Sequence, residues 1–222
     1  MEITNSQQIL TYLNDFSYRD SKYIQELIQE IEKLRAELSQ KTVSMVKLSH
    51  YRIITSNTLK RKENLIGWDK ANQRVFQSIA NIQKINKEEV SMLNSLLTQV
   101  ESVEFRDDEI YSGPLQYLHR SELDSAWTAF EKEVIDTPHS ILRSCELYIW
   151  LVTLHPFSNG NGRTARIVAD WSLLEQSYLP LCFDSSVSSH VAATIGSDER
   201  RKEQSITKTL NAIIRAYKIS LS

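Results

Sequence analysis

The feature that most constrains the fold is a run of apolar and aromatic residues from 141 to 152, which leads directly into a loop rich in glycine and asparagine. Cys145, Tyr148 and Trp150 lie in this run. A helix that is apolar on all sides is buried in a protein core. We therefore expect a buried helix at the centre of the domain, with a tight loop at its C-terminal end.

A second helix is predicted just after the loop. Ile167, Val168, Trp171 and Leu174 recur there at helical spacing. The first N–H groups of a helix lack helical partners and attract anions. Arginine in a first turn opposes the helix dipole, so arginines at this helix start indicate an anionic ligand nearby.

The rest of the chain is also predominantly helical in pattern. Short or amphipathic helices are predicted over residues 6–16 and 21–38, and two helices between 43 and 82, broken near 64–67. Asn86 has the sequence context of an N-cap, and Ser121 that of a capping box. The inward residues of the helices that they open are Val90, Leu93, Leu96, Leu97 and Val100, and then Leu123, Ala126, Trp127, Phe130 and Val134. A last helix is predicted over 200–219.

Residues 103–118 alternate between apolar and polar positions, with a turn signal at 107–108, which predicts a short β-hairpin. The fold class is therefore all-α with one small hairpin. We expect an N-terminal helical region, residues 1–85, packed on a core formed by residues 86–222. The face that residues 21–38 present is expected to dock on this core, with dimerisation or antitoxin binding as the alternative.

Composition excludes several classes of function. The chain has 222 residues, a formal net charge of −2 and a pI of about 6.2, which does not indicate nucleic-acid binding. No apolar stretch has transmembrane length, and no basic segment followed by an apolar run opens the chain. Two cysteines in apolar surroundings favour a reducing compartment. We expect a cytoplasmic protein without membrane contact, with secretion into a host cell left open.

The loop between the two central helices carries the chemistry. His155 is a base near neutral pH, Gly160 and Gly162 let the backbone approach a ligand, and Arg163 and Arg166 share a helix face that suits phosphate oxygens. Each feature alone has a structural explanation, because Asn-Gly pairs are common turns. Together they indicate phosphoryl chemistry, in which the imidazole deprotonates a hydroxyl. The spacing of a Walker A loop is absent from the sequence.

The stretch from His155 to Arg166 reads His-Pro-Phe-Ser-Asn-Gly-Asn-Gly-Arg-Thr-Ala-Arg and resembles the signature of Fic (Fido-domain) proteins, HPFx(D/E)GNGRxxR. It matches at every defined position except Asn159. The resemblance extends over about residues 86–185 and includes Thr137-Pro138-His139 before the buried helix. It implies a Fic/Fido helical domain in which the hairpin is the flap, and makes residues 86–222 the catalytic core.

The resemblance also implies a reaction, the transfer of AMP from ATP to a Ser, Thr or Tyr hydroxyl of a target protein with release of pyrophosphate. His155, Asn161 and Arg163 would be the catalytic residues, and the flap near 103–117 would align the protein substrate. The nucleotide would be held by Phe157, Ser158, Asn159, Gly160, Asn161, Gly162, Arg163 and Arg166.

Asn159 stands where the resemblance implies a carboxylate that binds Mg²⁺. A neutral amide oxygen is a poorer ligand for this hard cation, so we expect ATP with weakened Mg²⁺ use, or Mn²⁺. The family's inhibitory string, (S/T)xxxE(G/A)N, is absent from the sequence. The nearest stretch, Ser56-Asn57-Thr58-Leu59-Lys60, has lysine in place of glutamate. Control by a separate antitoxin chain, or no such control, is the expectation.

Alternatives remain open within this chemistry. Another phosphate-containing group, such as UMP, phosphocholine or phosphate, could be transferred, or AMP could be removed. Gly162 argues against the Doc-like kinase branch, which usually has lysine there. A third alternative is a weakly active nucleotide- or protein-binding module, because Asn159 replaces the carboxylate.

Overall fold

The computed structural model describes residues 6–39, 48–49, 51–53, 61–101, 104–112, 115–183 and 201–222. The N-terminal elements are α1 (Ser6–Leu13), the 3₁₀ turn η1 (Ser17–Asp20), α2 (Lys22–Leu38), α4 (Lys62–Ala80) and α5 (Lys87–Thr98). They are followed by β1 (Tyr111–Ser112), β2 (Leu115–Gln116), the 3₁₀ turn η2 (Arg120–Glu122), α6 (Leu123–Phe130) and the π-helical turn η3 (Glu131–Ile135). The chain then forms α7 (Ile141–Leu154), α8 (Asn161–Glu175) and α10 (Arg201–Leu221).

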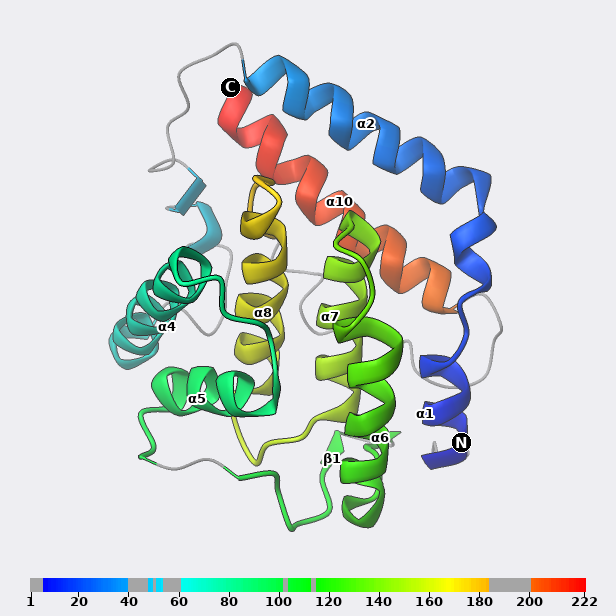
Figure 1. Cartoon of the computed structure of the whole chain (residues 1–222), viewed down its shortest axis with the longest axis vertical. Helices are drawn as coiled ribbons and strands as arrows, with labels where there is room; N and C mark the ends of the chain where they lie inside the picture. The colour runs from blue at the N-terminus through cyan, green and yellow to red at the C-terminus, as the bar shows by residue number, and fades with distance from the viewer. Residues whose placement is uncertain are drawn as a thin grey trace.

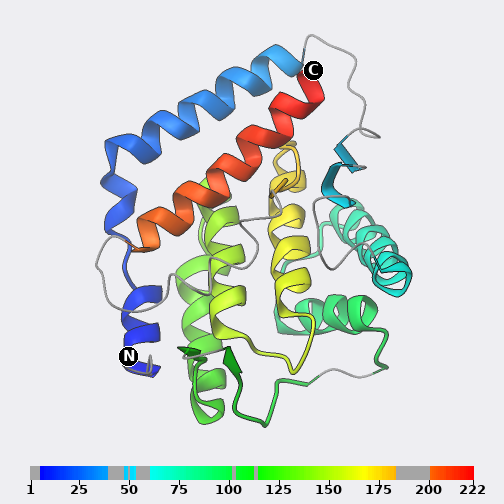
Figure 2. The same cartoon turned by 180° about the vertical axis from the view of Figure 1, so that it is seen from behind.

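The centre of the fold is the antiparallel pair α7 and α8 (Figure 1). Helices α2 and α10 lie side by side across one end of this pair, and α4 and α5 pack beside α8 (Figures 1 and 2). The loop that joins α7 to α8 lies at the end of the pair remote from α2. This arrangement places residues 155–160 where α5, the strand pair and α6 approach one another (Figure 1).

The predicted buried helix is confirmed. From Ile141 to Leu154, every residue of α7 except Leu142 is buried. The main core cluster takes residues from α1 and α2 as well as from α10, so it spans the predicted boundary at residue 85. That boundary stays a prediction. A small second cluster joins Leu48, Cys182 and Ala216. The apolar face of α2 is covered by α10, with Ile24, Leu27 and Ile31 buried, as expected for a docked helix.

The predicted break at 64–67 is wrong, because α4 runs through it. Gly67 is there because α4 approaches α5 closely. A Cβ at Gly67 would lie 2.7 Å from the carbonyl oxygen of Leu96 and 2.8 Å from that of Leu97. Glycine inside a helix can mark a close helix contact as well as a break.

Residues 104–118 differ in part from the predicted hairpin. Residues 104–107 are not a strand, and 103 lies outside the described residues. The strands pair antiparallel further along the chain, with Tyr111 opposite Gln116 and Ser112 opposite Leu115. They are only two residues long. The role of this segment as a flap stays a prediction.

Two local predictions concern helix starts. Asn86 caps α5 as predicted, since its side chain accepts a hydrogen bond from the Glu89 N–H. The capping box at Ser121 is wrong: Ser121 lies inside η2, which His119 caps, and α6 begins at Leu123 without a side-chain cap. Val100 follows α5 and is half exposed rather than inward.

Other predictions have simpler outcomes. Cys145 and Cys182 are buried free thiols. None of the described helices has the length and hydropathy to cross a membrane. The stretch 56–60, nearest to the inhibitory string, lies outside the described residues.

Candidate functional site

His155 terminates α7 in a left-handed conformation, with φ of 50°. A non-glycine residue in this region is uncommon and needs support from its surroundings. Arg106 supplies it. Its Nε donates to the carbonyl oxygen of His155 at 2.7 Å, and its backbone N–H donates to that of Pro156 at 2.8 Å. Arg106 also donates to the carbonyl oxygens of Asp108 and Leu118, so it ties the loop to the segments on both sides of the strand pair.

The imidazole of His155 is enclosed. Tyr117 stacks on it with 3.9 Å between ring centroids, and Nδ1 lies 3.3 Å from the carbonyl oxygen of Val152. If Nδ1 carries the proton and donates to this oxygen, Nε2 keeps its lone pair. Burial lowers the pKa of His155 to about 4, helped by the charge of Arg106 and opposed by the hydrogen bond to Val152. The ring is therefore neutral at pH 7 and able to accept a proton.

Phe157 and Asn161 hold the loop. The Phe157 ring is buried and packs edge-on against Phe105, at 5.7 Å between centroids. The Asn161 amide brackets the Phe157 backbone, because Oδ1 accepts from its N–H at 2.9 Å and Nδ2 donates to its carbonyl oxygen at 2.6 Å. The buried Phe157 ring thus anchors the loop in the core, and contact of Phe157 with a nucleotide stays a prediction. The side chain of Asn161 shapes the loop, so contact of this amide with a phosphate stays a prediction.

The two glycines of the loop have different environments. Gly160 caps α8 with φ of 80°, and an added Cβ would lie 2.7 Å from Thr98 Cγ2 and 2.9 Å from Asn94 Nδ2. Gly162 lies in the first turn of α8, and apart from its chain neighbours and the helix backbone, no atom of the described residues lies within 4 Å of an added Cβ. Gly160 is therefore required by packing and backbone geometry. Gly162 faces open space beside the first N–H groups of α8, which are the groups that a helix leaves for an anion.

Asn94 is a loop-holding residue that the sequence reasoning missed. Its buried side chain on α5 donates from Nδ2 to the carbonyl oxygen of Asn159 and to Thr164 Oγ1, both at 2.9 Å. The available signal was an asparagine beside Leu93, on the inward face of a predicted helix. A buried amide needs partners, and the loop backbone provides one.

The arginines lie on α8 as predicted, but only Arg163 is in its first turn. Nη1 of Arg163 donates to Asn64 Oδ1 at 2.7 Å and to the carbonyl oxygen of Leu97 at 2.6 Å, which connects it to α4 and α5. Arg166 is half-buried, and its Nε donates to the carbonyl oxygen of Gly162 at 3.1 Å. Sequence reasoning missed Asn64, because 64–67 was interpreted as a helix break.

Arg166 lies close to two further positively charged side chains, those of Arg52 and Arg163. Burial lowers the pKa of Arg166, and the charges of Arg52 and Arg163 act in the same direction, whereas Tyr148 and Asp170 oppose it. Asp170 is the partner of Arg52 in an ion pair. Because Asp170 is committed to that pair, an anion at Arg163 and Arg166 would relieve repulsion between like charges.

The donor set for a metal is poor. Asn159 is exposed, and its Oδ1 accepts from the Gly160 N–H at 2.7 Å. Within the described residues, no group of three or more His, Cys, Asp or Glu side chains could hold a metal ion. Mg²⁺ in phosphate-binding sites is usually held by one or two carboxylates together with substrate oxygens. The protein residues at this loop therefore do not fit a resident Mg²⁺ site.

Solved structures share this fold. The chain resembles Fic-1 (residues 134–508) of C. elegans with a TM-score of 0.64 and 16% identity, over 89% of this chain and 72% of that one. It also resembles a Fic domain containing signaling protein of Bacteroides thetaiotaomicron, with a TM-score of 0.57 and 14% identity over 88% and 94% of the two chains. A third similar structure is IbpAFic2 covalently tethered to Cdc42, with a TM-score of 0.53, 15% identity and coverage of 86% and 70%.

Two curated proteins match by sequence. Protein adenylyltransferase Fic of Drosophila erecta is 24% identical over 136 residues, 58% of this chain and 28% of its own length. Uridine 5'-monophosphate transferase of Xanthomonas campestris pv. campestris is 34% identical over 70 residues, 32% of this chain and 13% of its own. These matches span less than a third of either relative. The profile of the Fic/DOC family, in contrast, matches residues 11–173, and the chain belongs to this family.

Proposed function

We propose that this protein transfers AMP from ATP to a hydroxyl group of a target protein. The observation that carries the proposal is the position of a neutral, enclosed imidazole, His155, one loop away from the first turn of α8 with its arginines. A general base beside an anion-binding helix start suits the attack of a hydroxyl on a phosphorus atom. The D. erecta relative is named as an adenylyltransferase, which favours AMP as the group transferred.

In the proposed reaction, Nε2 of His155 takes the proton of a Ser, Thr or Tyr hydroxyl of the target. The hydroxyl oxygen forms a bond to the α-phosphorus of ATP, and the bond from this phosphorus to the bridging oxygen breaks. Pyrophosphate leaves with the electron pair. Backbone N–H groups at the start of α8 would stabilise the charge on the α-phosphate, while Arg163 and Arg166 would hold the β- and γ-phosphates.

The strand pair is the proposed flap. Tyr117, which stacks on His155, directly follows β2, and its N–H donates to the carbonyl oxygen of Ile110 at 3.0 Å. A target segment that pairs with β1 or β2 would have its backbone fixed relative to the base. Pairing of this kind reads the backbone and not the sequence. The similarity to IbpAFic2 tethered to Cdc42 is consistent with a protein substrate.

Mg²⁺ belongs to this proposal as part of the substrate, MgATP. Since the loop offers only the neutral Asn159 oxygen, the phosphates themselves would supply most of the metal ligands. The protein would then act by orienting the hydroxyl and neutralising phosphate charge. We expect a high Mg²⁺ requirement, or a preference for Mn²⁺.

A second candidate is transfer of UMP, favoured by the match to a uridine 5'-monophosphate transferase. The deciding experiment incubates the protein with cell lysate and with ATP labelled at the α- or the γ-phosphate, or UTP labelled at the α-phosphate, in parallel. AMP transfer predicts label on protein from α-labelled ATP alone. Stronger labelling from UTP than from ATP would show that UMP, and not AMP, is the group transferred. Label from γ-labelled ATP would indicate phosphate transfer and contradict both nucleotidyl proposals.

His155→Ala is the control in each arm, because label that persists in this variant does not come from the proposed chemistry. Nucleotide binding by the wild type without label on any lysate protein, in Mg²⁺ and in Mn²⁺, would favour the binding-module alternative and contradict the proposed activity.

A further inference from the structure

A cavity lies at the ends of α7 and α8 that are remote from the His155 loop. It has a volume of about 700 Å³ and lies between the end of α4 with residues 82–85, residues 135–139 with Arg143, and the end of α8. Because α7 has 14 residues, the cavity is about 20 Å from His155. Its volume is in the range of sites for small organic ligands.

The walls of the cavity are partly apolar. Ile85 and Ile135 are buried, whereas Ile82 is 89% exposed. Ile82 follows the end of α4 and has a φ of 55°. The N–H of Gln83 donates to the carbonyl oxygen of Ser78 at 2.9 Å and closes the turn that ends the helix. Glycine is the usual residue at the position that Ile82 occupies in this kind of helix end. A β-branched residue is strained there. A ligand with an apolar body could cover this exposed side chain.

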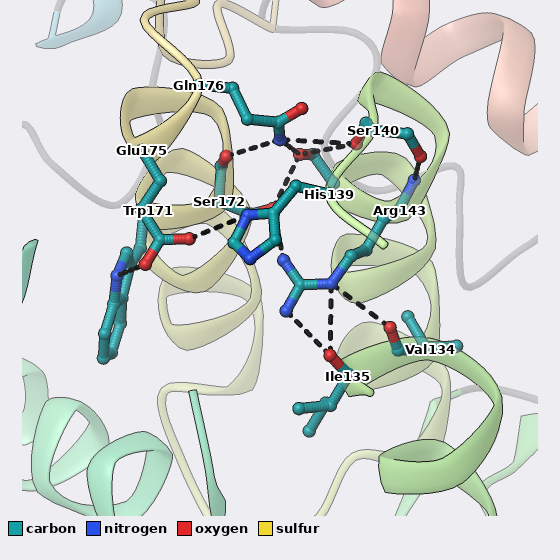
Figure 3. Close-up of polar contacts among 10 residues, drawn as sticks. Val134, Ile135, His139, Ser140, Arg143, Trp171, Ser172, Glu175 and Gln176 are labelled. Atoms are coloured by element: carbon teal, nitrogen blue, oxygen red, sulfur yellow. Dashed lines mark hydrogen bonds and ion pairs between the residues drawn. The ribbon is translucent and has the colours of Figure 1, made fainter. Parts of the chain in front are cut away.

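Glu175 provides the polar centre (Figure 3). Its Oε1 accepts from the indole N–H of Trp171 at 2.7 Å, which fixes the carboxylate. Its buried Oε2 accepts no hydrogen bond within the described part of the chain and lies 3.3 Å from Nδ1 of His139. The His139 side chain is 54% exposed, and such surface pairs contribute little stability. His139 can therefore be replaced as the neighbour of Oε2.

Arg143 and Lys84 are basic residues of the cavity lining, and the donors of Arg143 are committed (Figure 3). They bind the carbonyl oxygens of Val134 and Ile135, which end η3, and Ser172 Oγ, at 2.8–3.3 Å. No ion pair between Arg143 and Glu175 is found among the described residues. Arg143 therefore stabilises the end of η3 through its hydrogen bonds. Burial lowers the pKa of Arg143, and the charge of Glu175 opposes this shift without a direct hydrogen bond between the two side chains in the described part of the chain.

Gln83, which follows the end of α4, adds a second acceptor to the cavity lining. Its Oε1 is buried and, among the residues that the structure describes, has no hydrogen-bond partner. Gln83 Oε1 and Glu175 Oε2 are the two buried side-chain atoms of the described cavity lining that lack a hydrogen bond, and both are acceptors. Glu175 Oε2 has only the exposed His139 beside it. Buried acceptors without hydrogen bonds are unfavourable, and a ligand that donates hydrogen bonds would satisfy them.

We propose that this cavity binds a small organic ammonium ion, with the ammonium group at Glu175 and an apolar body against Ile82, Ile85 and Ile135. The carboxylate selects positive charge, Gln83 accepts a further N–H, and the isoleucines cover the hydrocarbon part. The site is separate from the proposed transfer reaction and does not depend on it.

The test titrates the ¹⁵N-labelled protein with 2-phenylethylammonium and follows the Trp171 indole N–H signal by NMR. Two probes with a similar body, neutral 2-phenylethanol and anionic 3-phenylpropanoate, provide the comparison. Saturable shifts of Trp171 are expected for the ammonium, with affinity at least tenfold weaker for the alcohol and none for the carboxylate. Equal affinity for all three probes, no saturable shift, or shifts confined to the 155–166 loop would overturn the proposal.

The chain provides a matched control. Trp127 donates to Glu131 Oε1 at 2.8 Å, four residues apart as in the Trp171–Glu175 pair, but Glu131 is outside the cavity. Glu175→Gln should weaken ammonium binding at least tenfold, whereas Glu131→Gln should leave it unchanged. Equal effects of the two substitutions would contradict a specific role of Glu175. Circular dichroism is measured first, to confirm that both variants fold before their affinities are compared.

Ile82→Gly separates a ligand role from a purely structural one. Glycine relieves the strained φ, so the melting temperature should stay the same or rise by about 2–4 °C. Affinity for 2-phenylethylammonium should nevertheless fall several-fold, because the apolar cover is lost. Unchanged affinity in this variant would remove Ile82 from the site and overturn the proposed placement of the ligand body.

Discussion

The ring of Tyr117 stacks on the imidazole of His155, with 3.9 Å between centroids and 24° between the planes. This contact joins the end of the strand pair to the proposed base, and it helps to bury the imidazole. Tyr117→Leu should therefore raise the pKa of His155 toward its ordinary value of 6.5 and reduce transfer about tenfold through loss of positioning.

Titration of the His155 ring proton by NMR measures the first effect, and initial rates of labelling measure the second. Tyr117→Phe keeps the stacked ring and is the control, so it should retain the low pKa and most of the activity. A Leu variant with an unchanged His155 pKa would show that the stack does not control this group.

The low pKa of His155 predicts a pH dependence. The folded pKa of about 4 lies below the ordinary value of 6.5, so the unfolded chain binds more protons between these pH values. The contribution to stability is complete above pH 6.5 and is lost as pH falls through 4, by at most on the order of 3 kcal/mol. His155 should likewise remain unprotonated, and therefore active as a base, down to about pH 5, so kcat/KM should not fall above this pH through protonation of His155.

Denaturant unfolding from pH 7.5 to 4 checks the stability prediction, with His155→Gln as the reference that lacks the titrating group. The difference in unfolding free energy between the two proteins should shrink as pH falls. A difference that is independent of pH would contradict the assigned pKa.

The two glycines of the loop should respond differently to alanine. Gly160→Ala adds a Cβ 2.7 Å from Thr98 Cγ2 at a left-handed φ, which should destabilise the fold by about 1–3 kcal/mol. Gly162→Ala meets open space in a helix and should keep or slightly raise stability, yet slow transfer because the methyl group obstructs the phosphate. Thermal melts and labelling rates distinguish these effects, and full activity of Gly162→Ala would place the phosphate elsewhere.

Asn159→Asp should lower the Mg²⁺ concentration that AMP transfer requires. The carboxylate keeps an acceptor for the Gly160 N–H and adds an anionic oxygen for Mg²⁺. The Mg²⁺ concentration for half-maximal rate is expected to fall several-fold. In EDTA the same substitution should slow any residual transfer, because the new charge repels the phosphates. An unchanged Mg²⁺ dependence would rule out Asn159 as the reason for weak metal use.

The local part of the site was predictable from sequence, whereas its supports were not. His155, Phe157 and the start of α8 follow from one continuous stretch whose helix patterns and loop residues are local. Asn94 holds this loop from 65 residues away and Asn64 contacts Arg163 from 99 residues away. Such contacts depend on how α4 and α5 pack, which periodicity does not specify.

The errors in the predicted fold also come from contacts between segments that are distant in sequence. Gly67 was interpreted as a break because glycine weakens an isolated helix, but the packing of α4 against the Leu96 and Leu97 carbonyls decides in favour of a continuous helix. The turn was predicted too early, at 107–108, because the alternating residues before it resemble a strand in sequence, whereas residues 104–107 have no strand structure and the strands pair at 111–112 and 115–116. Buried, strongly patterned helices such as α7 were predicted correctly, since their apolar faces have no alternative environment.

The most direct test of the proposed function is a comparison of wild type and His155→Ala for both ATP binding and AMP transfer. Binding is measured by calorimetry with MgATP, and transfer by label from α-labelled ATP on lysate proteins. The account predicts ATP affinities within about threefold of each other and transfer reduced by about 10²–10⁴ in the variant. Transfer by His155→Ala at the wild-type rate would contradict the assignment of His155 as the base.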